Sequence, residues 1–116
     1  MYEDYDDLKE AVEAAGFFTT FQPIRQPGDR IICASRSSPR GLSGNSFWVA
    51  RRGGEWYVAT WSPLIYRLPD ASRLVELCLL LLRRKPTGPF GAYAEFDEGV
   101  CAQFGLVRIA DDEFVD

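Results

Sequence analysis

The sequence contains no histidine among its 116 residues, and this absence excludes several kinds of active site. Histidine is the usual proton acceptor beside a nucleophilic serine or cysteine, and it is the commonest metal ligand in proteins. An enzyme with this sequence would depend on carboxylates, lysine, a thiol, tyrosine or a bound cofactor. We therefore predict a non-enzymatic protein with no catalytic residues, no metal site and no cofactor.

Cysteine is scarce and irregularly spaced. Cys33, Cys78 and Cys101 are an odd number, and none of them belongs to a Cys-x-x-Cys motif. Each has apolar neighbours, so we interpret all three as small core residues of a protein in a reducing compartment. The expected location is the cytoplasm.

Long hydrophobic runs are missing as well. The longest apolar stretch, residues 77–82, is far shorter than the ~20 residues that cross a bilayer. No basic segment precedes an apolar run near the start of the chain, so we expect no secretory signal. The net charge is −4, and five arginines with no acid lie in residues 30–54. We infer no membrane partner and no general nucleic-acid binding, because such binding needs a broad basic face.

The residues that are present indicate one folded domain. Apolar residues make up 47% of the chain and aromatic residues 14%, which predicts a core rich in rings. We predict a single α+β domain over residues 1–116. Its expected architecture is a two-layer sandwich, in which a mostly meandering antiparallel sheet of four to five strands packs against an N-terminal helix and helices of the C-terminal half. The predicted helices are 4–15, about 70–84 and 97–104, and the predicted strands are 17–21, 30–35, 45–52, 55–61 and 64–68, with 106–109 as an optional edge strand.

The clearest local signal is Gly53-Gly54 between two strand-like segments. Two glycines favour a type I′ turn, which would pair Arg52 with Glu55 and Trp48 with Ala59. Alternation along the strands then separates the side chains onto two faces. One face carries Trp48, Ala50, Tyr57, Ala59 and Trp61, and the other carries Phe47, Val49, Arg51, Trp56 and Val58.

Both faces of this hairpin are apolar, whereas a sheet with one solvated face alternates apolar and polar residues. Either helices cover both faces or one face binds a partner, with Trp48 and Trp61 flanking a shallow slot whose floor is alanine. The second predicted helix shows the same excess. Leu74, Leu77, Cys78 and Leu81 form one stripe, and Val75, Leu79, Leu80 and Leu82 leave little polar surface opposite. The first helix or a second chain provides the additional cover.

We therefore hypothesise a protein-interaction domain of the adaptor, chaperone-like or toxin-inhibitor (immunity) type. Its expected partner is another protein or a second copy in a homodimer. The residues expected to contact the partner are Trp48, Tyr57, Trp61, Leu79 and Leu82.

The alternative hypothesis is a module that binds a small anionic ligand or a nucleotide. Residues 35–46 read as a Ser/Gly/Arg-rich loop, which is long for a compact domain. The guanidinium groups of Arg36, Arg40 and Arg51 are expected to bind the anion, while a hairpin tryptophan stacks on a ring. The segment lacks the P-loop pattern. Arg51 lies opposite Trp56 in the predicted register and is placed to stack on it.

Overall fold

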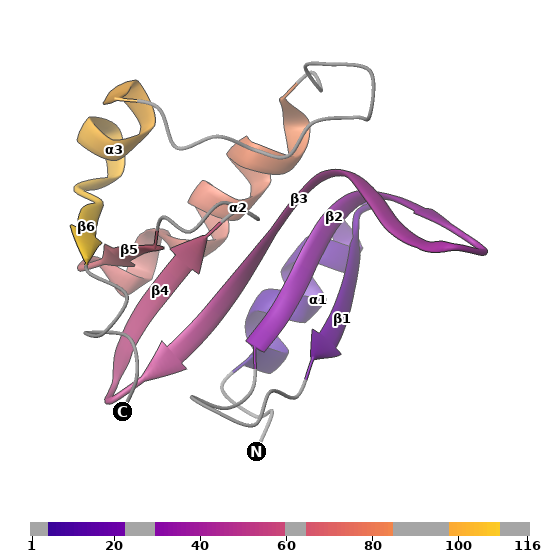
Figure 1. The fold of residues 1–116 in the computed structure, drawn as a ribbon, viewed down its shortest axis with the longest axis horizontal. Helices are drawn as coiled ribbons and strands as arrows, with labels where there is room; N and C mark the ends of the chain where they lie inside the picture. Colours follow the sequence, from indigo (N-terminus) through magenta and orange to yellow (C-terminus); the bar gives the residue numbers. More distant parts are fainter. Residues whose placement is uncertain (1–4, 23–29, 60–64, 85–97, 110–116) are drawn as a thin grey trace.

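The computed structural model describes residues 5–22, 30–59, 65–84 and 98–109, and within these ranges six strands form one antiparallel sheet. Each strand pairs with the next along the chain, in the order β1-β2-β3-β4-β5-β6 (Figure 1). The strands are β1 (Phe18–Gln22), β2 (Arg30–Ser38), β3 (Gly41–Arg52), β4 (Glu55–Ala59), β5 (Ile65–Leu68) and β6 (Val107–Ile109). The helices are α1 (Asp6–Ala14), the short 3-10 helix η2 (Ala71–Arg73), α2 (Leu74–Arg83) and α3 (Glu98–Phe104). The predicted α+β class with an antiparallel meander is confirmed.

The sheet holds one strand more than the predicted four to five, because β6 joins it. This three-residue strand follows α2 and α3 along the chain and pairs with β5, where Ile109 lies opposite Ile65 and Val107 opposite Arg67. Its residues are mostly exposed, so the sequence carries only a weak strand pattern there.

The β3–β4 hairpin has the predicted register. Gly53 and Gly54 adopt φ angles of 57° and 80°, as a type I′ turn requires. Arg52 pairs with Glu55, and the pairing continues to Trp48 opposite Ala59. The two sets of side chains therefore lie on opposite faces of the sheet.

Helices α1 and α2 cover one of these faces (Figure 1). Leu8 and Val12 of α1 and Leu77 and Leu81 of α2 are buried against strand residues in the larger hydrophobic cluster. Truncation of a leucine buried in this way costs about 2–5 kcal/mol. Tyr5, just before α1, connects α1 to the sheet. The Tyr5 hydroxyl oxygen accepts a hydrogen bond of 3.0 Å from the backbone N–H of Arg51 in β3.

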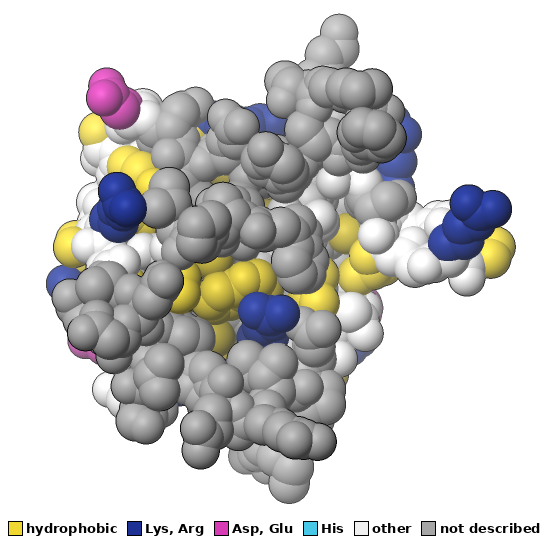
Figure 2. Space-filling view, in the orientation of Figure 1, with side chains coloured by type: hydrophobic (Ala, Val, Ile, Leu, Met, Phe, Trp, Pro, Cys, Tyr) yellow, Lys and Arg dark blue, Asp and Glu magenta, His cyan; other side chains and the backbone are white. Residues whose placement is uncertain are grey.

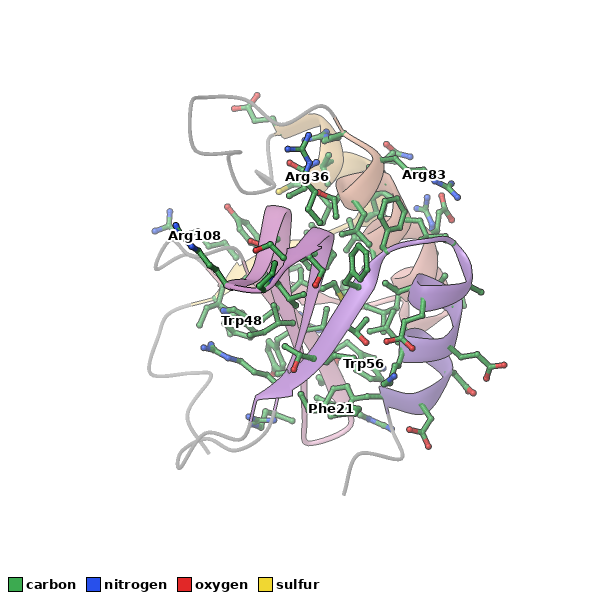
Figure 3. All side chains as sticks on the ribbon, turned by 90° about the vertical axis from the view of Figure 1, so that its right-hand side faces the viewer. Phe21, Arg36, Trp48, Trp56, Arg83 and Arg108 are labelled. Carbon is green, nitrogen blue, oxygen red and sulfur yellow. The ribbon has the colours of Figure 1, made fainter. Side chains whose placement is uncertain are left out.

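The opposite face of the sheet carries a second, smaller cluster. Ile32, Trp48, Ala50 and Ala59 are buried there, and no helix of the described part of the chain lies over them. Figure 3 shows Trp48 on this side of the sheet and Trp56 on the side that faces the helices. Both faces of the central hairpin are therefore buried, as the absence of alternation indicates.

Residues 35–46 form a hairpin extension, so the predicted loop is wrong. Strand β2 continues to Ser38 and β3 begins at Gly41, which leaves Pro39-Arg40 as a two-residue turn. Proline favours the first central position of such a turn, and Gly41 supplies the positive φ angle of 124° that follows. Residues 36–41 are all exposed, so no apolar alternation marks the strands. This distal hairpin (residues 35–46) projects from the body of the protein, with basic side chains at its end (Figures 1 and 2).

Candidate interaction surface on helix α2

The helical segment that contains α2 begins at a capped turn, close to the predicted start at about residue 70. The Asp70 carboxylate accepts hydrogen bonds from the backbone N–H of Ser72 at 3.1 Å and from its hydroxyl at 2.6 Å. These bonds lower the pKa of Asp70 and satisfy a donor that the helix leaves unpaired. The chain then passes through η2 into α2.

The other end of α2 is fixed by a residue that the sequence analysis did not identify. Asn45 is a buried polar side chain, and its amide nitrogen donates to the carbonyl oxygens of Leu81, at 3.0 Å, and Arg84. Helices leave their last carbonyls without donors, so this side chain terminates α2 from a neighbouring strand. A bulge in β2 positions it, because the Ser35 hydroxyl oxygen accepts the backbone N–H of Asn45 at 2.9 Å. A Cβ atom on Gly44 would lie 2.3 Å from that hydroxyl, so only glycine fits there.

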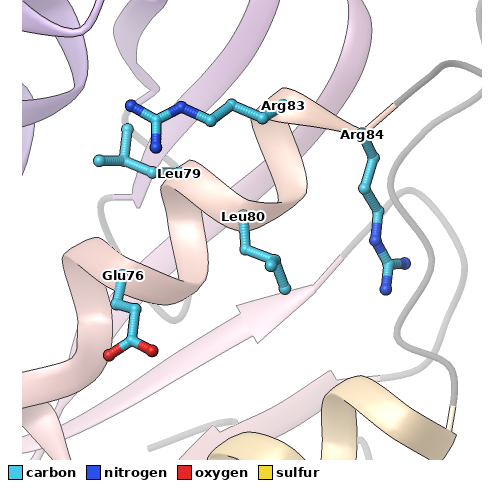
Figure 4. Close-up of a pocket in the computed structure, with 5 residues that line it drawn as sticks. All are labelled: Glu76, Leu79, Leu80, Arg83 and Arg84. Atoms are coloured by element: carbon cyan, nitrogen blue, oxygen red, sulfur yellow. The ribbon is translucent and has the colours of Figure 1, made fainter.

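The apolar residues of α2 divide between two faces. The residues that face the core are Leu74, Leu77, Cys78, Leu81 and Leu82, and all are buried. Leu79 and Leu80 are only half-buried and lie on the outer side. They line a hollow of ≈ 470 Å³ together with Glu76, Arg83 and Arg84 (Figure 4). We call Glu76, Leu79, Leu80 and Arg83 the outer stripe, since steps of three and four residues place side chains on one helix face.

The charged residues of this region have unequal environments. Arg73 forms an ion pair with Glu76 at 2.9 Å, which lowers the pKa of Glu76 and raises that of Arg73. The same guanidinium lies 4.3 Å from the ring centre of Phe104, so it joins η2, directly before α2, to α3. Arg83 is exposed and takes part in no ion pair among the described residues. One end of the outer stripe therefore carries an exposed carboxylate that already has one cationic neighbour, whereas the other end carries an exposed guanidinium.

The structure separates the predicted partner-contact residues. Leu79 lies on the outer stripe, but Leu82 is 2% exposed and belongs to the core. Trp48 is 6% exposed, with the Arg30 guanidinium 5.1 Å from its ring centre, so it does not border an open slot. Tyr57 is half-buried and packs against the same cluster as Trp48. Trp61 lies outside the described residues.

The predicted anion-binding arginines do not form one site either. Arg36 and Arg40 are exposed on the distal hairpin, and Arg36 pairs in register with Ser43. Arg51 lies eight residues after Ser43 along β3, and eight residues of extended strand span roughly 25 Å. Its guanidinium lies 5.6 Å from the ring centre of Trp56, as the register predicts.

Arg51 and Trp56 instead line a separate pocket of ≈ 350 Å³ at the junction of α1, the β3–β4 hairpin and the start of α2. Its lining combines apolar side chains with one acid and one base: Asp7, Leu8, Arg51, Trp56, Ala71, Leu74 and Val75. This pocket is a compact concave site that the sequence did not indicate, because its lining comes from three segments far apart in the chain.

Other kinds of site find little support in the described parts of the chain. Within these ranges, no group of three or more His, Cys, Asp or Glu side chains is placed to hold a metal ion. Among the same residues, none of the helices combines the length and apolar composition needed to span a membrane. No family model, no curated protein and no solved structure matches the chain.

Proposed function

We propose that this protein is a non-enzymatic protein-interaction domain, of the adaptor, chaperone-like or inhibitor type, and that it binds its partner through the outer stripe of α2. The observation that supports this most directly is the position of Leu79 and Leu80. Both are only half-buried, whereas the five apolar residues of α2 that face the core are enclosed. Two apolar side chains bordered by Glu76 and Arg83 match the pattern of a protein interface, which has an apolar centre and a polar or charged rim.

The burial of two of the cysteines supports a binding role rather than a reaction at a cysteine thiol. Cys33 and Cys78 are fully buried. A hydrogen bond with Cys33, together with burial, raises the pKa of Cys78 well above its ordinary value. A thiol in this environment stays protonated and is a poor nucleophile. Free, packed thiols also support our proposal that the protein works in the reducing cytoplasm.

A photo-crosslinking amino acid placed at Leu80 tests this function in the cells that make the protein. We expect a covalent adduct with one defined protein, identified by mass spectrometry. Val107, an apolar side chain that is 42% exposed on β6, provides the matched control position and should give no such adduct. Equal adduct patterns from the two positions, or none from Leu80, would remove the basis of the proposal.

A second candidate function is the binding of a small anionic ligand, and the pocket around Arg51 and Trp56 favours it. Its ≈ 350 Å³ lies within the usual range of small-molecule sites, about 300–1,000 Å³. Asp7 in the same pocket disfavours a multiply charged anion, so we expect a ligand with one acidic group and a hydrogen-bond donor. Titration of aromatic acids with a single carboxyl group should change tryptophan emission in the wild type but not in Trp56→Phe. Unchanged emission across the series would reject this candidate.

A further inference from the structure

We infer that the partner of the outer stripe is a second copy of this chain, with the two α2 helices antiparallel across a two-fold axis. This inference rests on the protein-interaction function proposed above and identifies its partner. It is carried by the order of the four side chains on one helix face: Glu76, Leu79, Leu80 and Arg83.

The outer stripe has the same spacing in both directions. Steps of three, one and three residues separate its members, so the midpoint lies between Leu79 and Leu80. In an antiparallel pair, each Glu76 lies level with Arg83 of the partner subunit, and each Leu79 lies level with Leu80 of the partner subunit. Acid then meets base at both ends, and leucine meets leucine between them. This self-complementarity is what a two-fold interface requires.

The lengths involved suit direct contact. Glu76 and Arg83 are seven residues apart, which is close to two helical turns and about 10 Å along the axis. Figure 4 shows Leu79 and Arg83 along one edge of this helix face and Glu76 and Leu80 along its other edge. The hollow of ≈ 470 Å³ that they line is available for the leucines of the second helix. Interdigitated leucines bordered by charge pairs are typical of antiparallel helix contacts.

Electrostatics select the antiparallel arrangement. A parallel pair would place Glu76 beside Glu76 of the partner subunit and Arg83 beside Arg83 of the partner subunit, and like charges at an interface are strongly unfavourable. The ion pair of Glu76 with Arg73 does not prevent the contact, because a carboxylate offers about four lone-pair sites and Arg73 uses two of them.

The size of the contact predicts a reversible dimer. A two-turn stripe on a ten-residue helix covers less than the ~800 Å² per partner of a standard stable interface. We expect a dissociation constant on the order of 10–100 μM, which requires measurement over a wide protein concentration range.

Sedimentation equilibrium of the full chain and of two charge-reversal variants tests the inference. In Glu76→Arg, both ends of the stripe are basic, and in Arg83→Glu both are acidic, so each variant alone should dimerise at least about tenfold more weakly than the wild type. An equimolar mixture of the two should recover association, because every basic end then meets an acidic one. Recovery also shows that both variants are folded. Glu10→Arg and Arg108→Glu make the same charge changes at exposed positions on α1 and β6 and should leave dimerisation unchanged.

Several results would overturn the inference. A wild-type chain that stays monomeric up to about 1 mM refutes self-association of this strength. A dimer that Arg83→Glu does not weaken, or a mixture of the two variants that fails to associate, refutes the antiparallel register. If the wild type is monomeric but Leu80 crosslinks to a different protein, the second copy is rejected and the interaction function stands. A monomer without a specific crosslink rejects both.

Discussion

Replacing Asn45 by alanine removes the donor that closes the last turn of α2, and its effect on stability follows from two contacts. The Asn45 amide nitrogen donates to the carbonyl oxygens of Leu81, which is buried, and of Arg84, which is nearer the surface. In Asn45→Ala the first oxygen keeps only the long hydrogen bond of 3.4 Å from the backbone N–H of Arg84, in a site that excludes water, whereas water can replace the donor at the second. Nothing else in the helix is altered.

The magnitude follows from the loss of both donated bonds. A typical hydrogen bond contributes about 0.5–1.5 kcal/mol, and the bonds to Leu81 and Arg84 are lost together. We therefore expect the free energy of unfolding to fall by about 1–3 kcal/mol. Asn45→Asp keeps the shape of the side chain but cannot donate to a carbonyl, so it should be at least as destabilising at pH 7.

Urea denaturation followed by circular dichroism measures the effect. The midpoint should shift by on the order of 1–2 M with little change in the slope. The protein should be used at about 1 μM, where self-association does not contribute to stability. A loss below about 0.5 kcal/mol in both variants, the range of an ordinary surface substitution, would show that Asn45 does not cap α2.

Three further predictions concern other features of the fold. Gly44→Ala should lower the free energy of unfolding by about 1–3 kcal/mol more than Gly16→Ala does. Both glycines have positive φ, but only at Gly44 would the new Cβ lie 2.3 Å from another side chain. Equal losses of unfolding free energy in urea denaturation would contradict this. The raised pKa of Cys78 means that the folded state keeps a proton that the unfolded state loses, so the contribution of Cys78 to stability should be constant below the unfolded thiol pKa of about 8.5 and fall as the pH rises above it. Cys78→Ala should abolish this alkaline loss, and an unchanged pH profile in the variant would argue against it. Hydrogen bonds, first from Lys9, lower the pKa of Glu13, so its contribution is present above about pH 4.3 and is lost as the pH falls through the lowered value. Glu13→Gln should thus be less stable than the wild type at pH 7 but not at pH 2, and a difference that persists at pH 2 would refute this origin.

The parts of the fold that could be predicted are those whose signals are local. Gly53-Gly54 determines the register of β3 and β4 because a two-residue turn leaves only one pairing. Asp70 marks the start of the second helical segment through its own side chain. In both cases the residues that form the feature are neighbours in the chain, so their types and spacing are sufficient.

The distal hairpin could not be predicted, because its strands are stabilised by backbone pairing and carry exposed side chains on residues 36–41. The outer stripe of α2 could not be predicted from the sequence for a different reason. Leu79, Leu80 and Leu82 are chemically alike, and only packing against α1 and the sheet buries Leu82 while leaving the other two at the surface. Asn45 was missed because its acceptors are 36 and 39 residues away in sequence.

These missed features are physically connected, and the connection yields a last prediction. Arg83 is the final residue of α2, and the turn that carries it is the turn that Asn45 closes. Without the donated hydrogen bonds this turn frays, and Arg83 no longer stays two turns from Glu76 on the same face. Asn45→Ala should therefore weaken self-association severalfold under conditions where the chain remains folded, although Asn45 is buried away from the outer stripe. Unchanged association in a variant that is clearly destabilised would mean that the end of α2 is positioned by the helix itself, and that the bulge at Ser35 contributes to stability alone.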